Sequence, residues 1–237
     1  MNGARESIEV HVDYEITWID EHLTWHPSDF ADPVKSLVVP QSDIWQPDIT
    51  LYELLESAPL IPEEKLKARV DFDGRVTVYN PQIMTLSCTM EIDLFPFDSQ
   101  KCRMAFGPWV YELNEVAIDE NNSTIADMTM IRGNTEWSIV TFEAATVSYT
   151  QPTGNYTVLY YFLTIKRNPV YYICVLIVPT LIITTLCLLG IFAPSSSSGE
   201  REEKVNLGLT TLLTVAVILS LVAEEMPKAT SLPLLGM

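Results

Sequence analysis

Residues 203–224 read E-K-V-N-L-G-L-T-T-L-L-T-V-A-V-I-L-S-L-V-A-E, and this stretch decides how the rest of the chain is organised. The 19 residues Val205–Ala223 are uncharged, and a glutamate stands on each side of the stretch. As an α-helix, it would place Glu203 and Glu224 about 31 Å apart, close to the ~30 Å hydrocarbon thickness of a bilayer. The pattern predicts a membrane-spanning helix with one carboxylate at each mouth.

One face of this predicted helix is graded in polarity. Its members recur at spacings of three and four residues and so share one side of the helix: Glu203, Asn206, Thr210, Leu213, Val217, Ser220 and Glu224. Polar groups that face lipid are costly, so the stripe favours the axis of a ring of helices. It then predicts a water-filled pore with acidic rings at both ends and an apolar constriction between them. The alternative is an ordinary span whose polar residues are buried against neighbouring helices.

Charge divides the chain into two parts. Of the 237 residues 48% are hydrophobic, and the formal net charge is −17. Residues 1–168 hold 11 Lys and Arg against 26 Asp and Glu, whereas residues 169–237 contain two apolar stretches with few charges. We therefore expect an acidic, water-facing domain at 1–168 and a membrane region at 169–237. Such an acidic domain excludes nucleic acid as a partner and concentrates cations.

Short runs with a period of two fill the first part of the chain. Apolar and polar residues alternate along 8–18, 90–94 and 159–165, as in half-buried strands. Asp73-Gly74 between two further runs is a hairpin signal, and Pro47 makes 45–48 a loop. Many short strands with no long helical period predict a mainly β, immunoglobulin-like sandwich followed by transmembrane α-helices.

A second apolar stretch, Val170–Ala193, runs for 24 residues without a charge and is long enough to span a bilayer. Pro179 within it is tolerable in a membrane helix. We therefore expect a first span at about 170–193, the pore-lining span at about 204–224, and the start of a third span at the C-terminus. The chain opens without an apolar leader, so we expect a fragment whose true start lies upstream.

Two features point to an extracellular, oxidising compartment. Sequons for N-glycosylation begin at Asn121, Asn122 and Asn155. Cys88 and Cys102 could close a 15-residue loop, and such a disulfide would stabilise the domain by roughly 3 kcal/mol.

The string C-x6-F-P-F-D-x3-C at 88–102 resembles the Cys-loop pentameric ligand-gated channels, most closely nicotinic acetylcholine receptor subunits. The resemblance covers about Trp18 to Leu235. Three further strings occur in the order found in the family: W-x-D-x2-L-x-W at 18–25, I-W-x-P-D-I at 44–49 and F-G-x-W-x-Y at 106–111. The resemblance implies a Cys88–Cys102 disulfide, an extracellular ligand-binding domain and a pentamer with other subunits of the family.

The resemblance also implies an agonist site in an aromatic cage between subunits, where a small ammonium such as acetylcholine or choline lies against ring faces. Matched by motif, the principal face would hold Tyr52, Trp109, Tyr149 and Tyr156. Without the resemblance, each of these rings could equally be a core residue. The remaining tryptophans are assigned to structure: Trp18, Trp25, Trp45 and Trp137.

Two departures from the family pattern bear on this site. The paired cysteines of agonist-binding α subunits are absent, and Gln151-Pro152 stands in their place. Asp13 replaces the tryptophan of the complementary face; it attracts an ammonium but cannot stack on it. A glycan on Asn155 would crowd the cage. We therefore expect a non-α subunit that assembles with others.

For coupling, the resemblance implies that a loop tip made of Phe95, Pro96, Phe97 and Asp98 meets the link after the pore helix, 225–234. Arg167 resembles an arginine that family members pair with a buried acid. The alternative is an interfacial cation that snorkels towards water.

The choice between cations and anions is predicted from the residue at the inner mouth of the predicted pore. Glu203 would favour cations there, because anion-selective family members lack that acid and carry a Pro-Ala pair nearby. The sequence thus predicts a cation-selective, neurotransmitter-gated channel subunit in the plasma membrane, with a postsynaptic location. Its partners are a small ammonium agonist, permeant cations, membrane lipid and related subunits.

The alternative is a truncated, non-conducting or regulatory binding subunit of the same family. An enzyme is the weakest class, since His11, His22 and His26 lie outside any metal spacing and no nucleophile elbow or phosphate loop appears. No cofactor and no metal are expected.

Overall fold

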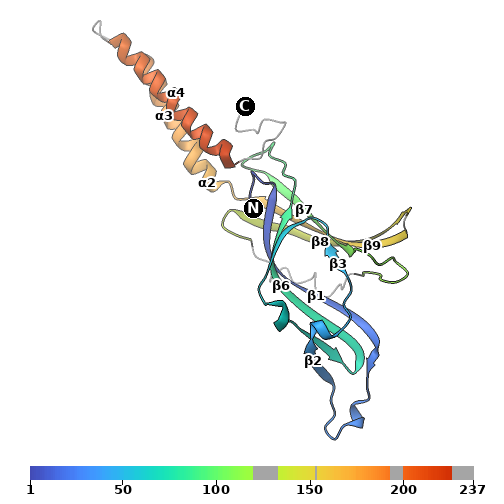
Figure 1. Ribbon diagram of the computed structural model, residues 1–237. Coiled ribbons are helices and arrows are strands. Elements are labelled where there is room, and N and C mark those ends of the chain that lie inside the picture. Colours follow the sequence, from blue (N-terminus) through green and yellow to red (C-terminus); the bar gives the residue numbers. More distant parts are fainter. Residues whose placement is uncertain (120–132, 153, 193–199, 226–237) are drawn as a thin grey trace.

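The computed structural model describes residues 1–119, 133–152, 154–192 and 200–225, with side chains of the last range described for 204–220 (Figure 1). Two β-sheets are followed by a pair of helices. The strands of the described ranges are β1 (Ser7–Thr24), β2 (Ser36–Pro40), β3 (Ile49–Leu51), β4 (Leu54–Pro59), β5 (Lys67–Asp71), β6 (Asp73–Ser87), β7 (Ser99–Pro108), β8 (Trp137–Gln151) and β9 (Gly154–Arg167). Short 3₁₀ turns lie at η1 (Pro27–Asp29), η2 (Gln41–Asp43) and η3 (Glu63–Lys65).

The two sheets form a sandwich, as the sequence predicts. One sheet has the strand order β1-β6-β5-β2, with β4 also paired to β6, and the other has the order β3-β7-β9-β8. All of these pairings are antiparallel. The main core joins Ile8 and Leu86 of the first sheet to Met104, Leu163 and Ile165 of the second. Apolar burial between the sheets is therefore what holds them together.

The alternation along 8–18 is confirmed, because these residues lie in β1 with their polar members exposed and their apolar members turned inward. The hairpin at Asp73-Gly74 is also confirmed, with Val70 of β5 opposite Val76 of β6. Gly74 has a φ of +84°, and a Cβ there would lie 2.4 Å from the backbone oxygen of Asp20. Both the turn and the contact with β1 therefore require glycine.

The strand expected at 90–94 is wrong. Met90 and Ile92 are buried, yet the segment joins no sheet and Leu94 is 61% exposed. The buried side chain of Gln100 replaces a partner strand: its Nε2 donates to the Glu91 carbonyl at 2.8 Å, and its Oε1 accepts from the Glu91 amide at 2.9 Å. The alternation along 90–94 therefore reflects which side chains are buried and does not indicate a paired strand.

A continuous helix begins where the sandwich ends. It consists of α2 (Val170–Tyr172), a π-helical turn η4 (Ile173–Ile177) and α3 (Val178–Phe192), and it continues through Pro179 as expected. The hydroxyl of Thr180 donates to the Ile177 carbonyl at 3.0 Å. Among the described residues, Val170–Phe192 is the one helix long and apolar enough to cross a membrane.

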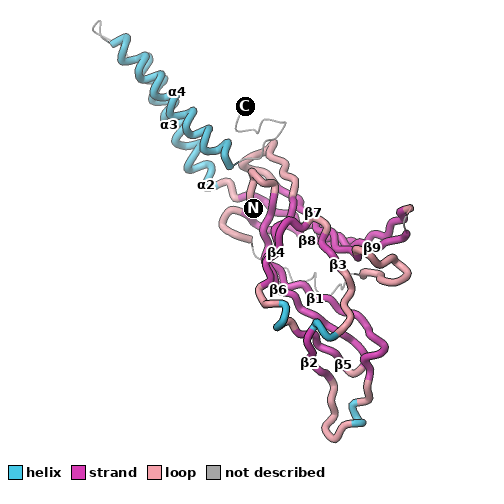
Figure 2. The backbone as a smooth tube through the Cα atoms, viewed as in Figure 1, coloured by secondary structure: helices cyan, strands magenta, loops and turns pink. Residues whose placement is uncertain are grey.

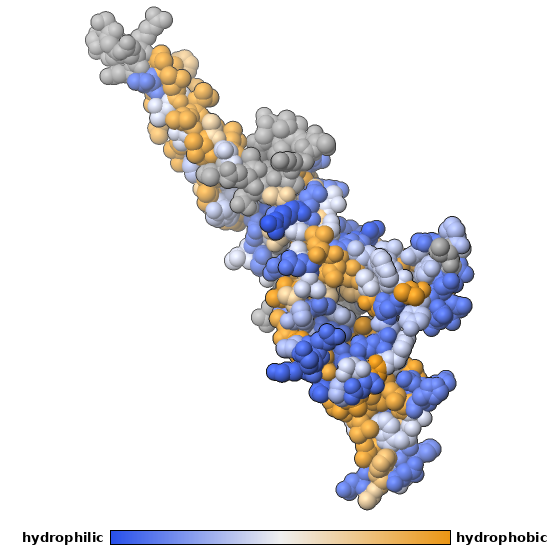
Figure 3. Space-filling model, in the orientation of Figure 1, coloured by the Kyte–Doolittle hydropathy of each residue, from blue (hydrophilic) through white to orange (hydrophobic). Residues whose placement is uncertain are grey.

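A second helix, α4 (Glu200–Glu225), runs beside α3 (Figures 1 and 2) and contains a shorter apolar stretch, Lys204–Ser220. A Cβ on Gly190 would lie 2.5 Å from a methyl of Leu207, so glycine permits this close approach. Lys204 Nζ donates to the Ile191 carbonyl at 3.3 Å. Figure 3 shows apolar side chains along both helices and many polar ones over the β domain. The expected third span lies outside the described residues.

Candidate functional site

The four aromatic residues expected in the cage gather at one side of the second sheet. Tyr52 follows β3, Trp109 follows β7, and Tyr149 and Tyr156 are opposite each other in the β8–β9 hairpin. The rings of Tyr52 and Trp109 are 6.2 Å apart at 66°, and those of Tyr149 and Tyr156 are 6.1 Å apart. Trp109 is 71% exposed and Tyr52 is 40% exposed, so ring surface remains open to a ligand.

Tyr52 is held by the end of β7. Its backbone amide donates to the Ala105 carbonyl at 3.0 Å, and its hydroxyl donates to the Pro108 carbonyl at 3.1 Å. The ring lies against Gly107, where a Cβ would stand 2.3 Å from the hydroxyl oxygen. Burial, and then the neighbouring Tyr149, raise the pKa of Tyr52 to about 12. The hydroxyl is therefore neutral and remains a donor at physiological pH.

Asp48 positions the loop that carries Trp109, a role that the sequence analysis did not assign. Its Oδ2 accepts hydrogen bonds from the backbone amides of Trp109 at 3.2 Å and Val110 at 2.6 Å. Nearby, Trp45 Nε1 donates to the Tyr111 hydroxyl at 3.3 Å. The loop at 45–48 thus supports the loop at 109–111 through a carboxylate and an indole. The signal available in the sequence was the string I-W-x-P-D-I.

The tip of the β8–β9 hairpin rests on the chain that follows Trp109. The amide of Leu113 donates to the Asn155 carbonyl at 2.7 Å. A Cβ on Gly154 would lie 2.5 Å from the carboxyl carbon of Glu112, so the two segments are in close contact. Asn155 is exposed and remains a predicted glycosylation site. The other two sequons, at Asn121 and Asn122, lie outside the described residues.

Asp13 belongs to a different surface. It is exposed on β1 in the first sheet, opposite Pro81 of β6, whereas the four aromatic residues belong to the second sheet and its adjoining loops. A role for Asp13 beside a cage therefore requires a second subunit.

The second cluster of polar groups is centred on Arg167 at the end of β9. Its Nε donates to Asp98 Oδ1 at 2.8 Å and its Nη2 to Asp98 Oδ2 at 3.3 Å, with the Asp98 side chain 1% exposed. Its Nη1 donates to Glu136 Oε1 at 2.6 Å and to the Tyr172 hydroxyl at 3.2 Å. Arg167 is thus held in a buried, largely satisfied network, which argues against the snorkelling alternative.

Aromatic rings enclose this guanidinium. Its Cζ lies 4.1 Å from the Trp137 ring and 5.0 Å from the Phe95 ring. Phe95 also contacts Tyr172, with ring centroids 4.8 Å apart. The disulfide loop therefore packs directly against the first turn of the apolar helix. Glu136 and Tyr172 were missed by the sequence analysis, because they stand far from Asp98 along the chain and belong to none of the quoted strings.

The disulfide loop is closed as expected, with Cys88 bonded to Cys102. At its tip, Phe95 and Pro96 are buried with a cis peptide between them, and Phe97 is 50% exposed. Of the link expected to meet this tip, 225–234, all but Glu225 lies outside the described residues.

Two faces of α4 differ in exposure. Half-buried residues recur at 204, 208, 211, 214, 215 and 218, on the side of the helix from which Lys204 bonds to α3. The stripe predicted to line a pore is exposed on a different face: Asn206, Thr210, Leu213, Val217 and Ser220. Leu213 is 66% and Val217 52% exposed. Glu203 and Glu224 lie in the helix, and their side chains are outside the described set.

The chemistry of the first cluster suits an organic cation, because electron-rich ring faces attract ammonium groups. Among the residues that the structure describes, no group of three His, Cys, Asp or Glu side chains is arranged to hold a metal ion.

A two-sheet domain with a disulfide loop, an aromatic cluster at its side and an apolar helix at its end defines a ligand-binding domain attached to a membrane region. Residues 1–169 match the family described as the neurotransmitter-gated ion-channel ligand binding domain, and residues 176–236 match the neurotransmitter-gated ion-channel transmembrane region. The chain belongs to this family of membrane-spanning, ligand-gated Cys-loop channels, whose binding domain is extracellular.

Similar proteins include nicotinic subunits and related channels. The chain is 36% identical over 242 aligned residues to the alpha-type acetylcholine receptor subunit acr-5 of Caenorhabditis elegans, covering 98% of this chain and 40% of that protein. It is 32% identical to the betaine receptor acr-23 (93% and 44% covered) and 30% identical to the proton-gated ion channel subunit pbo-6 (99% and 55% covered), both of the same organism. The chain thus spans about half the length of these relatives or less.

Proposed function

We propose that this chain forms part of a cation-selective channel subunit that is opened by a small ammonium ligand. The observation that carries the proposal is the convergence of Tyr52, Trp109, Tyr149 and Tyr156 from separate segments, with ring surface exposed. Each ring face contributes roughly 0.5–2 kcal/mol to binding of a desolvated cation. The excess of 26 Asp and Glu over 11 Lys and Arg in residues 1–168 also attracts cations to the domain.

The names of two relatives support this ligand class, since acetylcholine and betaine both carry a quaternary ammonium group. The cluster offers what such a group requires, namely ring faces without an obligatory hydrogen bond to the nitrogen. Trp109 is the central candidate because it is the most exposed of the four rings. In this proposal Asp13 contributes to the site of the neighbouring subunit.

Two of the strands that carry or adjoin cage residues, β7 and β9, also reach the membrane junction. β7 follows Asp98 directly and ends just before Trp109, while β9 begins just before Tyr156 and ends at Arg167. The two strands are paired along their length, and the span from Tyr156 to Arg167 is about 36 Å at ~3.3 Å per residue. Movement of the cage is thereby transmitted to the Arg167–Asp98 pair and to the first helix.

In the membrane, α4 lines the pore with its exposed stripe. Leu213 and Val217 form the apolar constriction, and Glu203 and Glu224 place carboxylates at its two mouths. The ligand opens this gate only to the extent that it binds the open state more tightly than the closed state. We place the channel in the plasma membrane at the postsynaptic side, assembled as a pentamer with subunits of the same family.

The test is electrical recording from the full-length subunit that contains this chain, co-expressed with candidate partner subunits. Acetylcholine, choline and betaine are applied to wild type and to Trp109→Leu, with Phe30→Leu as a control for loss of an exposed ring (50% exposed) outside the cage. We expect Trp109→Leu to raise the half-maximal concentration roughly 2- to 30-fold and the control to leave it unchanged.

Selectivity is read from the same recordings. Currents should reverse at the potential set by sodium and potassium. Reversal at the chloride potential would contradict cation selectivity, and ammonium binding without current would favour the non-conducting binding subunit instead.

A further inference from the structure

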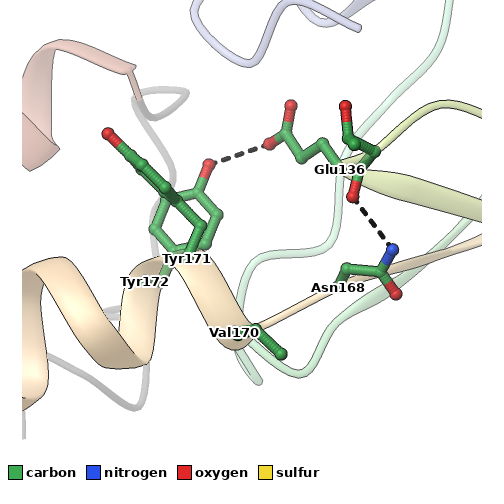
Figure 4. Close-up of a pocket in the computed structure, with 6 residues that line it drawn as sticks. Glu136, Asn168, Val170, Tyr171 and Tyr172 are labelled. Carbon is green, nitrogen blue, oxygen red and sulfur yellow. Dashed lines mark hydrogen bonds between the residues drawn. The ribbon is translucent and has the colours of Figure 1, made fainter.

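A cavity of about 310 Å³ opens at the junction of the β domain and the first helix (Figure 4). Its lining is made of Thr135, Glu136, Asn168, Val170, Tyr171 and Tyr172. The aromatic cage is built from other residues, so this cavity is a separate site. Two of these residues precede β8, one lies in the link after β9, and three form the first turn of the apolar helix.

The cavity lies at the boundary between water and membrane. Val170 is the first residue of the Val170–Phe192 helix, which is long and apolar enough to cross a bilayer. Residues at this level of a membrane protein meet the lipid headgroups, and tyrosines are enriched there. Tyr171 and Tyr172 occupy that level.

One wall of the cavity carries negative charge. Arg167 lies between two carboxylates, and Asp98 takes two of its donors, whereas Glu136 receives Nη1 alone. This group of one guanidinium and two carboxylates has a net charge of −1. Glu136, whose side chain is 41% exposed, is the member that lines the cavity. In Figure 4 the Tyr172 hydroxyl bonds to one carboxylate oxygen of Glu136, and the second oxygen points away from that hydroxyl.

The opposite wall is aromatic. The rings of Tyr171 and Tyr172 meet at 88° with centroids 5.5 Å apart, and Tyr171 is 67% exposed. Asn168 Nδ2 donates to the Thr135 carbonyl at 3.0 Å and ties the two halves of the lining together. Glu136 thus stands beside the Tyr172 hydroxyl and near the exposed Tyr171 ring, and a carboxylate close to an open ring face attracts a substituted ammonium.

We propose that this cavity binds the ammonium headgroup of a zwitterionic phospholipid of the outer leaflet, such as phosphatidylcholine. The cavity adjoins the start of the span and therefore lies at the height of the lipid headgroups. The exposed apolar side chains of the helix then accommodate the acyl chains. Because Glu136 and Tyr172 also hold Arg167, headgroup binding stabilises the junction between the β domain and the membrane region. The proposal is independent of which agonist opens the channel.

The test uses the full-length receptor purified in detergent and measures its melting temperature against added short-chain lipid, since a ligand that binds the folded state raises that temperature. The probes are dihexanoylphosphatidylcholine, dihexanoylphosphatidylglycerol, which has the same chains without an ammonium, and glycerophosphocholine, which is the headgroup without chains. The variants are Tyr171→Leu and Glu136→Gln. Phe192→Leu, at the far end of the same helix and 82% exposed, is the matched control.

We expect saturable stabilisation by the choline lipid, weakened roughly two- to fivefold in affinity by Tyr171→Leu and unchanged by Phe192→Leu. Glu136→Gln should weaken it as well; if that variant fails to fold because Arg167 loses a partner, Tyr171→Leu still decides the question. Equal stabilisation by the glycerol lipid would overturn the proposal. So would binding of glycerophosphocholine as tight as that of the choline lipid, because the site would then serve a free ammonium from water.

Discussion

Gly107→Ala tests whether the position of Tyr52 determines ligand binding. The added methyl carbon would lie 2.3 Å from the Tyr52 hydroxyl oxygen, 2.9 Å from Cζ and 3.1 Å from a methyl of Val158, where ordinary contact begins near 3.4 Å. The hydroxyl must therefore move by about 1 Å, which breaks its 3.1 Å bond to the Pro108 carbonyl and disturbs its packing on Trp109.

The expected size follows from these two contacts. A neutral hydrogen bond contributes about 0.5–1.5 kcal/mol and an aromatic pair about 0.5–1.5 kcal/mol, so the change costs about 1–3 kcal/mol. If the free energy of agonist binding is weakened by this amount, the half-maximal agonist concentration rises roughly 5- to 150-fold. The assay is a concentration–response curve on the full-length receptor, normalised to the amount of protein at the cell surface.

Tyr52→Phe provides the matched comparison. It removes the hydroxyl, so the nearest ring atom to the new methyl is Cζ at 2.9 Å and the clash is smaller. Gly107→Ala added to Tyr52→Phe should therefore cost less than Gly107→Ala in wild type. A half-maximal concentration that stays within twofold of wild type in Gly107→Ala, at normal surface amounts, would refute the reasoning.

Three further predictions concern stability. Cys88→Ala should lower the free energy of unfolding by roughly 3 kcal/mol and reduce delivery to the cell surface, measured by surface labelling. Asp98→Asn should destabilise the receptor by about 3–5 kcal/mol, because the buried Arg167 loses the carboxylate that takes two of its donors and keeps only the half-exposed Glu136; a melting temperature equal to that of wild type would contradict this. Tyr52 has a pKa of about 12, above the ordinary 10, so its contribution to stability is complete below pH 10 and is lost as the pH rises through 12; in an absorbance titration, Tyr52→Phe should form less tyrosinate near pH 12 than wild type.

A matched control accompanies the Asp98 prediction. Arg69 pairs with Asp71 at 3.3 Å, but its side chain is 60% exposed. Arg69→Gln should therefore change the stability by about 1 kcal/mol at most. A large loss in this variant would mean that burial is not what gives the Arg167 pair its importance.

Local patterns predicted the sandwich well. The alternation along 8–18 became β1, because one face of a half-buried strand must be apolar, and Asp73-Gly74 became a turn, because Gly74 adopts a positive φ. The alternation at 90–94 failed for a physical reason. It reports which side chains are buried, whereas strand formation also needs a neighbouring backbone, and there the Gln100 side chain takes that place.

The candidate sites depended on tertiary contacts that no local pattern contains. Tyr52 and Trp109 are 57 positions apart and meet only because β3 pairs with the end of β7. Asp48 was read as a loop residue, since its carboxylate acquires a role only when the amides of Trp109 and Val110 face it. Glu136 likewise becomes a partner of Arg167 only through the pairing of β8 with β9.

Incorporation of fluorinated tryptophans at position 109 of the full-length channel tests the central claim most directly. Each fluorine withdraws electron density from the ring face and weakens its attraction for a cation, while the shape of the Trp109 side chain is nearly kept. The proposed function predicts that the half-maximal concentration of an ammonium agonist rises stepwise with the number of fluorines. A half-maximal concentration that stays constant across the series would contradict an ammonium held against the face of Trp109.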